Sequence, residues 1–184
     1  MIRNFFYKKP ILDQSGGVEY AFTMSANDTQ ATGEGGLVHS VSARTATPGY
    51  EAWKAFNTDL DYNNSWYATD AFTTTWLQVR FNSARVVRRY DVSSTNYSGP
   101  TYGSYSPRDW TFEGSNDGSA WTTLDSRTAQ TAWAMPTQTR SYTFSNSTAY
   151  TYYRINISNN TGADGNSNYG SAYYTFFGRL RLYS

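Results

Sequence analysis

One segment of the chain, SPRDWTFEGSNDGSAWTTLDS at residues 106–126, restricts the possible fold more than any other. In its first half the side chains alternate, so that Trp110 and Phe112 fall on the same face of an extended strand. Asn116-Asp117-Gly118 follows, and these residue types tolerate the positive φ that a tight hairpin turn requires. The chain then returns from Ala120 to Leu124. The segment therefore predicts a β-hairpin whose strands need antiparallel partners.

Further short segments with the same alternation predict more strands. They are residues 37–41, 76–81, 86–92, 140–145, 152–158 and 176–183. Only YEAWKAF, residues 50–56, indicates a helical turn or two. Many short alternating strands separated by polar turns are typical of an antiparallel sandwich or barrel. We therefore expect an all-β fold.

The composition agrees with a β-rich protein and excludes several function classes. Aromatic residues make up 18% of the 184 residues and charged residues only 16%, which suits either a pleated core or a surface that faces sugars or proteins. The net charge is +1, and the dense basic clusters are only Lys8-Lys9 and Arg85-Arg88-Arg89, so nucleic acid is not an expected partner. Without cysteine, disulfides and thiolate metal sites are excluded.

Residues 1–17 form a segment of their own, which we interpret as an N-terminal arm before a domain at 18–184. Its apolar residues are Phe5, Phe6, Tyr7, Ile11 and Leu12. The arm either packs on its own domain or anchors the chain to another subunit. It lacks the apolar run of a secretory signal, and no run in the chain is long enough to span a membrane. We expect synthesis in a host cytoplasm and no membrane insertion.

Six motifs in order resemble one known family, the discoidin or coagulation-factor C-type domain. They are AWKAFNTDLDYNNSW (52–66), WLQVRF (76–81), VVRRYDV (86–92), the hairpin (106–124), YYRINIS (152–158) and GRLRLY (178–183). The family has the galactose-binding-like fold of carbohydrate-binding modules. The resemblance implies a single antiparallel β-sandwich of jelly-roll type, in which the hairpin is scaffold and not site.

The resemblance also raises the question of a metal. Family members often hold a structural Ca²⁺ through an Asp-Gly-Asn loop and a Glu in the last strand, and hard oxygen ligands suit this ion. The corresponding loop residues here are Asn57, Asp59, Asp61 and Asn64, whereas the last-strand position is Arg179. Our hypothesis is that the Arg179 guanidinium replaces the metal by pairing with Asp59 or Asp61. Alternatively, Arg179 faces solvent and Ca²⁺ still binds the loop.

A sugar site in this family lies on loops at one end of the sandwich, where an aromatic ring packs on the sugar and polar groups bind its hydroxyls. The candidate residues are His39, Arg44, Tyr62, Tyr67, Tyr97, Tyr102, Tyr105, Trp133 and Tyr169. Trp66 matches a structural tryptophan of the family and is left out. The loop at 95–107 either offers its tyrosines to a ligand or packs them on itself, and His39 is either a ligand residue or an ordinary strand histidine.

Catalysis has little support, because the chain has one His, no Cys and no nucleophile elbow, and Asp59 and Asp61 lie in a loop that the family uses structurally. We expect a non-enzymatic protein that attaches to host-surface glycans in multiple copies. The free-standing domain and its arm resemble virion components, such as a bacteriophage tail fibre or head decoration protein, so we expect a virion location and virion proteins as partners. The alternatives are a purely structural decoration subunit and a free, extracellular lectin-like module.

Overall fold

The computed structural model describes residues 17–20, 22–23, 32–33, 36–42, 49–56, 60–69, 75–96, 105–134, 136–161 and 174–184. Within these ranges the regular structure is β-strand, with two short 3₁₀ helices, η1 (Ala52–Phe56) and η2 (Tyr62–Asn64). No helix of the described part is long and apolar enough to cross a membrane. Residues 1–16 of the expected arm lie outside the described residues.

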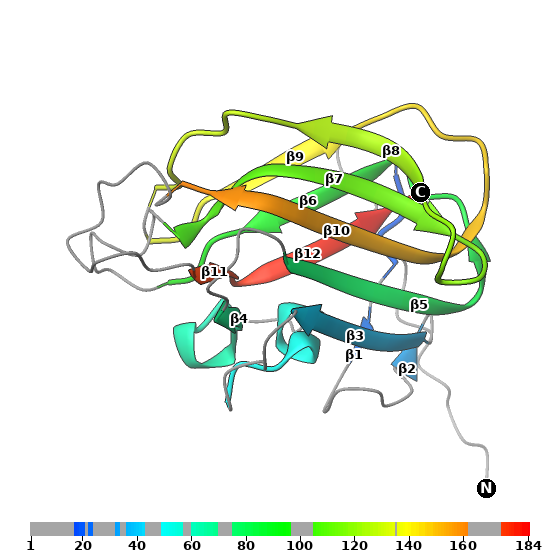
Figure 1. The fold of residues 1–184 in the computed structure, drawn as a ribbon. Helices are drawn as coiled ribbons and strands as arrows, with labels where there is room; N and C mark the ends of the chain where they lie inside the picture. Colours follow the sequence, from blue (N-terminus) through cyan, green and yellow to red (C-terminus); the bar gives the residue numbers. More distant parts are fainter. Residues whose placement is uncertain are drawn as a thin grey trace, which may run out of the picture.

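Two antiparallel sheets form the body of the fold (Figure 1). The larger sheet has the order β3 (Gly36–Ser42), β5 (Thr75–Arg85), β10 (Tyr150–Asn160), β7 (Pro107–Ser115) and β8 (Thr122–Arg127). The smaller sheet has the order β12 (Arg179–Tyr183), β6 (Arg89–Ser93) and β9 (Thr139–Thr143). Two short pairs accompany them, β1 (Phe22–Thr23) with β2 (Thr32–Gly33) and β4 (Trp66–Thr69) with β11 (Tyr174–Phe177).

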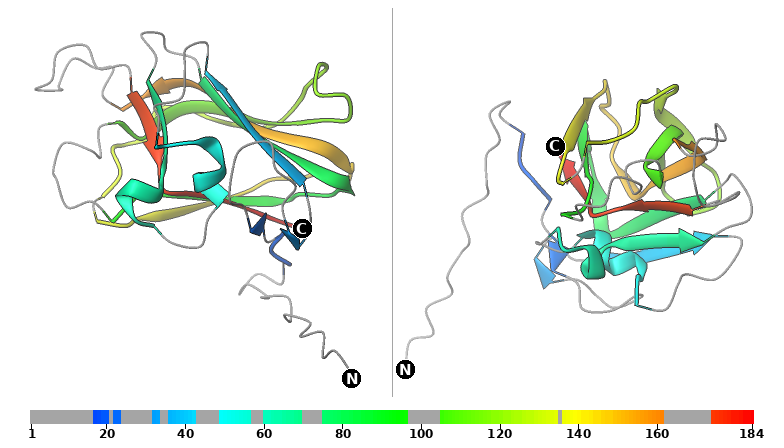
Figure 2. Two further views of the ribbon diagram at one scale, coloured as in Figure 1. Left: turned by 90° about the horizontal axis from the view of Figure 1, so that it is seen from below. Right: turned by 90° about the vertical axis from the view of Figure 1, so that its left-hand side faces the viewer.

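The core lies between the two sheets, which appear as two layers when the molecule is seen from below (Figure 2, left). Side chains alternate along each strand, so every second residue faces the opposite sheet. The ring of Tyr90 on β6 stacks on Phe112 of β7 with centroids 4.3 Å apart, and Phe112 stacks in turn on Tyr153 of β10 at 5.7 Å. Leu180 and Leu182 of β12 are buried in the same core. The expected all-β antiparallel sandwich is confirmed.

The predicted hairpin is present as β7 and β8 at one edge of the larger sheet, but its connection is longer than a tight turn. β7 pairs with β10 on one side and with β8 on the other. β7 ends at Ser115 and β8 begins at Thr122 rather than Ala120, which leaves residues 116–121 between them. Of these, only Gly118 has a positive φ, at 73°. The carboxylate of Asp117 accepts hydrogen bonds from the backbone N–H groups of Ser119 and Ala120, both at 2.8 Å, and thereby closes this wider turn.

The segment between β5 and β6 differs from the predicted strand at 86–92, because β6 begins only at Arg89. Here the chain crosses from the larger sheet to the smaller one. Val87 is buried at the crossing, where its N–H donates to the Tyr153 hydroxyl at 3.1 Å and its carbonyl accepts from the Asn146 amide at 2.9 Å. Apolar residues stand on both sides of Arg88-Arg89, so the segment was interpreted as one continuous strand and the sequence alone does not reveal the corner. The last predicted strand is likewise divided at Gly178 into β11 and β12.

The strand directions give the sandwich two distinct ends (Figure 1). We call one of them the loop end. In the larger sheet, β7 begins and β10 ends at the loop end. In the smaller sheet, β9 and β12 begin and β6 ends there. The opposite end carries the turn at 116–121 and the C-terminus. There the chain segment at 17–20 joins the edge of β12, since Tyr20 N–H donates to the Leu182 carbonyl at 2.9 Å and Ser184 N–H to the Val18 carbonyl at 3.0 Å.

Candidate functional site

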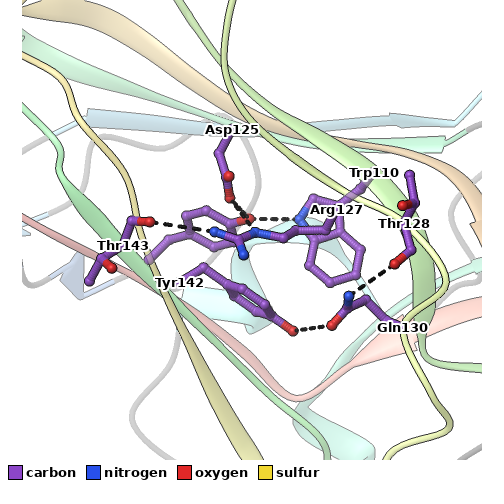
Figure 3. Close-up of polar contacts among 8 residues, drawn as sticks. Trp110, Asp125, Arg127, Thr128, Gln130, Tyr142 and Thr143 are labelled. Atoms are coloured by element: carbon purple, nitrogen blue, oxygen red, sulfur yellow. Dashed lines mark hydrogen bonds and ion pairs between the residues drawn. The ribbon is translucent and has the colours of Figure 1, made fainter.

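A buried polar network ties the two sheets together near the loop end (Figure 3). The hydroxyl of Tyr90, on the smaller sheet, accepts a hydrogen bond from Trp110 Nε1 at 2.8 Å and donates one to Asp125 Oδ2 at 2.7 Å. Trp110 and Asp125 both belong to the larger sheet. Burial raises the pKa of Tyr90 well above its ordinary value, so the phenol keeps the proton that it donates.

The network continues outward to the chain segment that follows β8. Arg127 Nε donates to the same oxygen of Asp125 at 2.8 Å, and its guanidinium lies 4.9 Å from the ring centroid of Tyr142. The Tyr142 hydroxyl donates to Gln130 Oε1 at 3.3 Å, and Gln130 Nε2 donates to the Thr128 carbonyl at 3.1 Å (Figure 3). The Gln130 amide is therefore held on one side by Tyr142, a core residue, and on the other by the carbonyl of Thr128 in the same segment.

The connection between β8 and β9, at residues 128–138, is held in an unusual backbone conformation. Ala129 and Thr137 have φ values of 52° and 57°, in the left-handed region that side chains other than Asn, Asp and Gly rarely adopt. Asp109 Oδ1 accepts the Ala129 N–H at 2.6 Å, and the Thr137 N–H donates to the Thr95 carbonyl at 2.9 Å. These contacts stabilise both strained positions.

Arg140 fixes the middle of the same connection. Its guanidinium donates to the carbonyls of Thr131 and Ala132, at 3.0 and 3.1 Å, and to Gln138 Oε1 at 3.1 Å. The same group stacks over the ring of Trp133 at 4.7 Å, and Trp133 is only 3% exposed. The buried Trp133 ring and the Arg140 guanidinium therefore hold the connection in place.

A pocket of about 210 Å³ opens between this connection and the adjoining ends of β7 and β10. Its lining residues are Arg108, Ala129, Gln130, Thr131, Ala132 and Thr161. Arg108 is the second residue of β7, and Thr161 follows the last residue of β10 and donates its N–H to the Ser106 carbonyl at 3.0 Å. The lining thus offers a guanidinium, an amide and two hydroxyls.

A second group of side chains, three tyrosines beside Lys54, lies at the loop end near η1 and η2. The ring of Tyr50 contacts those of Tyr62 and Tyr67 with centroid distances of 5.5 and 5.6 Å. The Lys54 ammonium lies 5.8 Å from the Tyr50 centroid and donates to the carbonyls of Gly49 and Asn63. Tyr62 and Tyr67 are partly exposed, so they offer ring edges or faces to a ligand.

The structure places only part of the predicted sugar-binding residues. Tyr62 and Tyr67 come together through Tyr50, as described above. Tyr105 and Trp133 are buried, at 5% and 3% exposed, so neither ring is open for a sugar to stack on it. His39 lies within β3 opposite Gln78, and its side chain is not among those that the structure describes. Arg44, Tyr97, Tyr102 and Tyr169 lie outside the described residues.

The predicted calcium ligands are only partly described, because Asn57 and Asp59 fall outside the described residues. Asp61 Oδ1 accepts the Asn63 N–H at 2.8 Å and so caps η2. Leu60 packs beside Gly178, and a Cβ added to this glycine would lie 3.3 Å from Leu60 Cδ2. Arg179, the next residue, is partly buried, and burial together with Arg181 lowers its pKa.

That Arg179 stands in place of a calcium-binding carboxylate stays a prediction from the resemblance. Among the described residues, no three His, Asp or Glu side chains gather closely enough to hold a metal. The pairing of Arg179 with Asp59 or Asp61 remains a hypothesis.

Comparison with protein families identifies the fold and the family together. Residues 54–155, more than half of the chain, match the family described as the NedA-like, galactose-binding domain of F5/F8 type C. The chain belongs to this family, which confirms the discoidin-type assignment. A comparison with curated proteins found no match.

Solved structures with the same fold include carbohydrate-binding modules. The family 32 module of Streptococcus pneumoniae EndoD is 10% identical, with a TM-score of 0.60 over 80% of this chain and 95% of its own. The family 32 module of C. perfringens NanJ, in complex with galactose, is 14% identical, with a TM-score of 0.59 over 81% and 93%. The corresponding module of AlyQ, in complex with 4,5-unsaturated mannuronic acid, is 16% identical, with a TM-score of 0.57 over 90% and 97%.

Sequence reasoning missed the residues that line the pocket. Gln130, Thr131 and Thr161 belong to common polar types, and no spacing in the sequence distinguishes them from other surface residues. Arg108 lies inside the hairpin motif that we interpreted as scaffold. Tyr50 was also missed, although it lies only two residues before the AWKAF motif.

We expect the melting temperature of the full chain to be the same in CaCl₂ and in EDTA. Calcium present at a hundredfold excess over its Kd would stabilise the fold by about 2.7 kcal/mol. For a chain of this size that corresponds to a rise of roughly 5–10 °C. Differential scanning calorimetry in the two buffers measures the difference directly. A calcium-dependent rise of this size would show that the loop binds the ion despite Arg179.

Proposed function

We propose that this protein is a non-enzymatic carbohydrate-binding protein that attaches to host-surface glycans through the loop end of the sandwich. The proposal rests on one observation: two surfaces that could bind a sugar lie at that end of a galactose-binding-type domain. One is the polar pocket beside Arg108, and the other is the tyrosine group of Tyr50, Tyr62 and Tyr67. A ring for the C–H face of a sugar and fixed donors for its hydroxyls are the two elements that sugar binding needs.

Two features support a carbohydrate ligand. Structures of the same fold include modules in complex with galactose and with an unsaturated mannuronic acid. The remaining candidates are flanked by described residues that belong to the loop end. Asn96 and Tyr105 flank the segment with Tyr97 and Tyr102, and Thr161 precedes the segment with Tyr169.

The absence of catalysis is part of the proposal and rests on how the carboxylates near the pocket are used. Asp125 accepts hydrogen bonds from Tyr90 and Arg127, and Asp109 accepts one from the Ala129 backbone. A glycosidase of the usual type needs two carboxyl groups that face the scissile bond, one of them with a raised pKa. Both carboxylates here serve the fold.

We also propose that the protein is part of a virion, as a tail or head decoration protein present in multiple copies and joined to other virion proteins through its N-terminal arm. The support is that residues 17–20 join β12 at the end opposite the loop end, so the chain enters the domain at the end remote from the proposed glycan site. Multiple copies raise the avidity of weak glycan contacts. A structural decoration subunit without glycan binding and a free extracellular lectin-like module are the alternatives.

We expect the full chain to bind specific glycans on an array, equally with calcium and with EDTA. The double variant Tyr62→Ala/Tyr67→Ala should lose most of this signal, because it removes the partly exposed rings at the loop end. Tyr152→Ala is the matched control, since Tyr152 is a partly exposed tyrosine of β10 that lies near Gly118 in the turn at the opposite end. Both variants are first compared with the parent by circular dichroism and melting temperature.

The array result can contradict the proposal in two ways. Silence of the folded parent in both buffers would favour the structural decoration subunit. Binding that survives in the tyrosine double variant but is lost in Tyr152→Ala would place the ligand away from the loop end.

We expect deletion of residues 1–16 to abolish incorporation into particles while leaving glycan binding unchanged. The reason is that the arm precedes the segment at 17–20, which belongs to the end remote from the pocket. Co-sedimentation of the full and shortened chains with particles assembled without this protein measures incorporation, and the array measures binding. Failure of the full chain to associate with any particle would argue for the free lectin-like module.

A further inference from the structure

We propose that Lys54 is the residue that positions the tyrosine group, because its ammonium holds the turn at 49–51, η1 and η2 around one fixed positive charge. In this role the lysine does what a bound metal ion does when it joins oxygen ligands from separate parts of a chain. The inference rests on the proposed function, since it names the group that orders one of the two proposed glycan-binding surfaces.

The burial of Lys54 distinguishes it from an ordinary surface lysine. Its side chain is only 14% exposed, whereas lysine side chains are mostly exposed and are buried only when they are paired. The ammonium lies 5.8 Å from the ring centroids of both Tyr50 and Trp53, so two aromatic rings border it. A charge that is largely removed from water needs partners within the protein.

The oxygen atoms around the ammonium supply these partners. An ammonium has three N–H donors. The carbonyls of Gly49 and Asn63 accept hydrogen bonds from it, the second at 2.9 Å, and Glu51 Oε2 forms an ion pair with it at 3.8 Å. Carbonyl and carboxylate oxygens are also the ligands that Ca²⁺ takes. Here a covalently attached cation lies among them, and this role is independent of the hypothesis for Arg179.

The turn at 49–51 is shaped to hold the cation. Gly49 has a φ of 92°, a left-handed conformation that glycine adopts readily. Glu51 Oε1 accepts the Gly49 N–H at 2.9 Å, while the other oxygen of this carboxylate pairs with Lys54. Burial raises the pKa of Glu51, but the backbone N–H groups of Glu51 and Gly49 and the Lys54 ammonium outweigh it and lower the pKa. The carboxylate therefore stays charged beside the ammonium.

These contacts fix the tyrosine group through the residues next to its members. Gly49 directly precedes Tyr50, and Asn63 directly follows Tyr62. The Tyr67 N–H donates to the Tyr50 carbonyl at 3.2 Å, which joins the turn to β4. The ammonium thus holds the backbone on which these rings are mounted. Rings that are fixed before a glycan arrives lose little entropy on binding.

The test compares the parent chain with Lys54→Met, which keeps an unbranched side chain beside the rings and removes the charge. Hydrogen exchange at the Tyr67 amide reports whether the turn at 49–51 stays in place, because this amide donates to the Tyr50 carbonyl. We expect exchange at Tyr67 to become about tenfold faster or more, the range for a hydrogen bond to a charged group. Exchange at the Tyr20 amide, at the opposite end, should change less. Glycan binding should weaken by about tenfold, because the rings must then be ordered on binding.

Two further variants separate the charge from the packing of the side chain. Arg88→Met is the matched control, since it removes the same charge from an exposed arginine directly before β6, at the opposite end, and it should behave as the parent does. Lys54→Ala removes a propylammonium group. We expect added propylammonium to slow exchange at Tyr67 in Lys54→Ala, and 1-propanol, which has a similar shape without the charge, to leave it fast.

The outcomes distinguish this inference from the proposed function. Unchanged exchange at Tyr67 in Lys54→Met would overturn the inference, and so would equal rescue of Lys54→Ala by propylammonium and 1-propanol. If Lys54→Met binds glycans as well as the parent does, the positioning role fails and the proposed function stands. If exchange and rescue follow the expectation while the parent binds no glycan, the proposed function fails and Lys54 still orders the tyrosine group.

Discussion

The hydrogen bonds of the Tyr90 hydroxyl hold the loop end of this protein to its core. One oxygen on the smaller sheet accepts from Trp110 and donates to Asp125 on the larger sheet, inside a stack of aromatic rings that would otherwise exclude polar groups. A buried hydroxyl without partners would cost about 1–3 kcal/mol, so the arrangement requires all its members. Asp125 also binds Arg127, the last residue of β8. The hydrogen-bonded chain from Tyr90 through Asp125 therefore extends to the start of the connection at 128–138.

The two ends of the sandwich differ in the groups that they present. At the loop end, Arg127, Tyr142 and Arg140 fix Gln130 and Thr131 around a small polar pocket, and the tyrosines near η2 lie at the same end. At the opposite end the turn at 116–121 is closed by its own side chains, and the chain segment at 17–20 extends the smaller sheet. The proposed glycan site and the point where the chain enters the domain therefore lie at opposite ends of the sandwich.

The fold followed from the sequence because burial imposes a visible pattern on strands. Trp110 and Phe112, and Leu180 and Leu182, alternate with polar residues and all four are buried as expected. The corner at Val87 left no such mark, because Val86 and Val87 are adjacent apolar residues and Arg88 and Arg89 follow them. The pocket was not predictable for a related reason: the connection at 128–138 has no periodicity, Ala129 is not a residue type associated with positive φ, and Trp133, an aromatic in a polar segment, suggested an exposed ring but is buried beneath Arg140.

The measurement that tests this account most directly is a comparison of Tyr90→Phe with the parent chain, by urea unfolding and by hydrogen exchange at the amides of residues 128–134. Tyr142→Phe serves as the control, since it removes only the outer contact to Gln130. The account predicts that Tyr90→Phe lowers the free energy of unfolding by about 1–3 kcal/mol and speeds exchange across 128–134, with a smaller effect of Tyr142→Phe. Unchanged stability and unchanged exchange in Tyr90→Phe would show that the loop end is held by other contacts and would contradict the account.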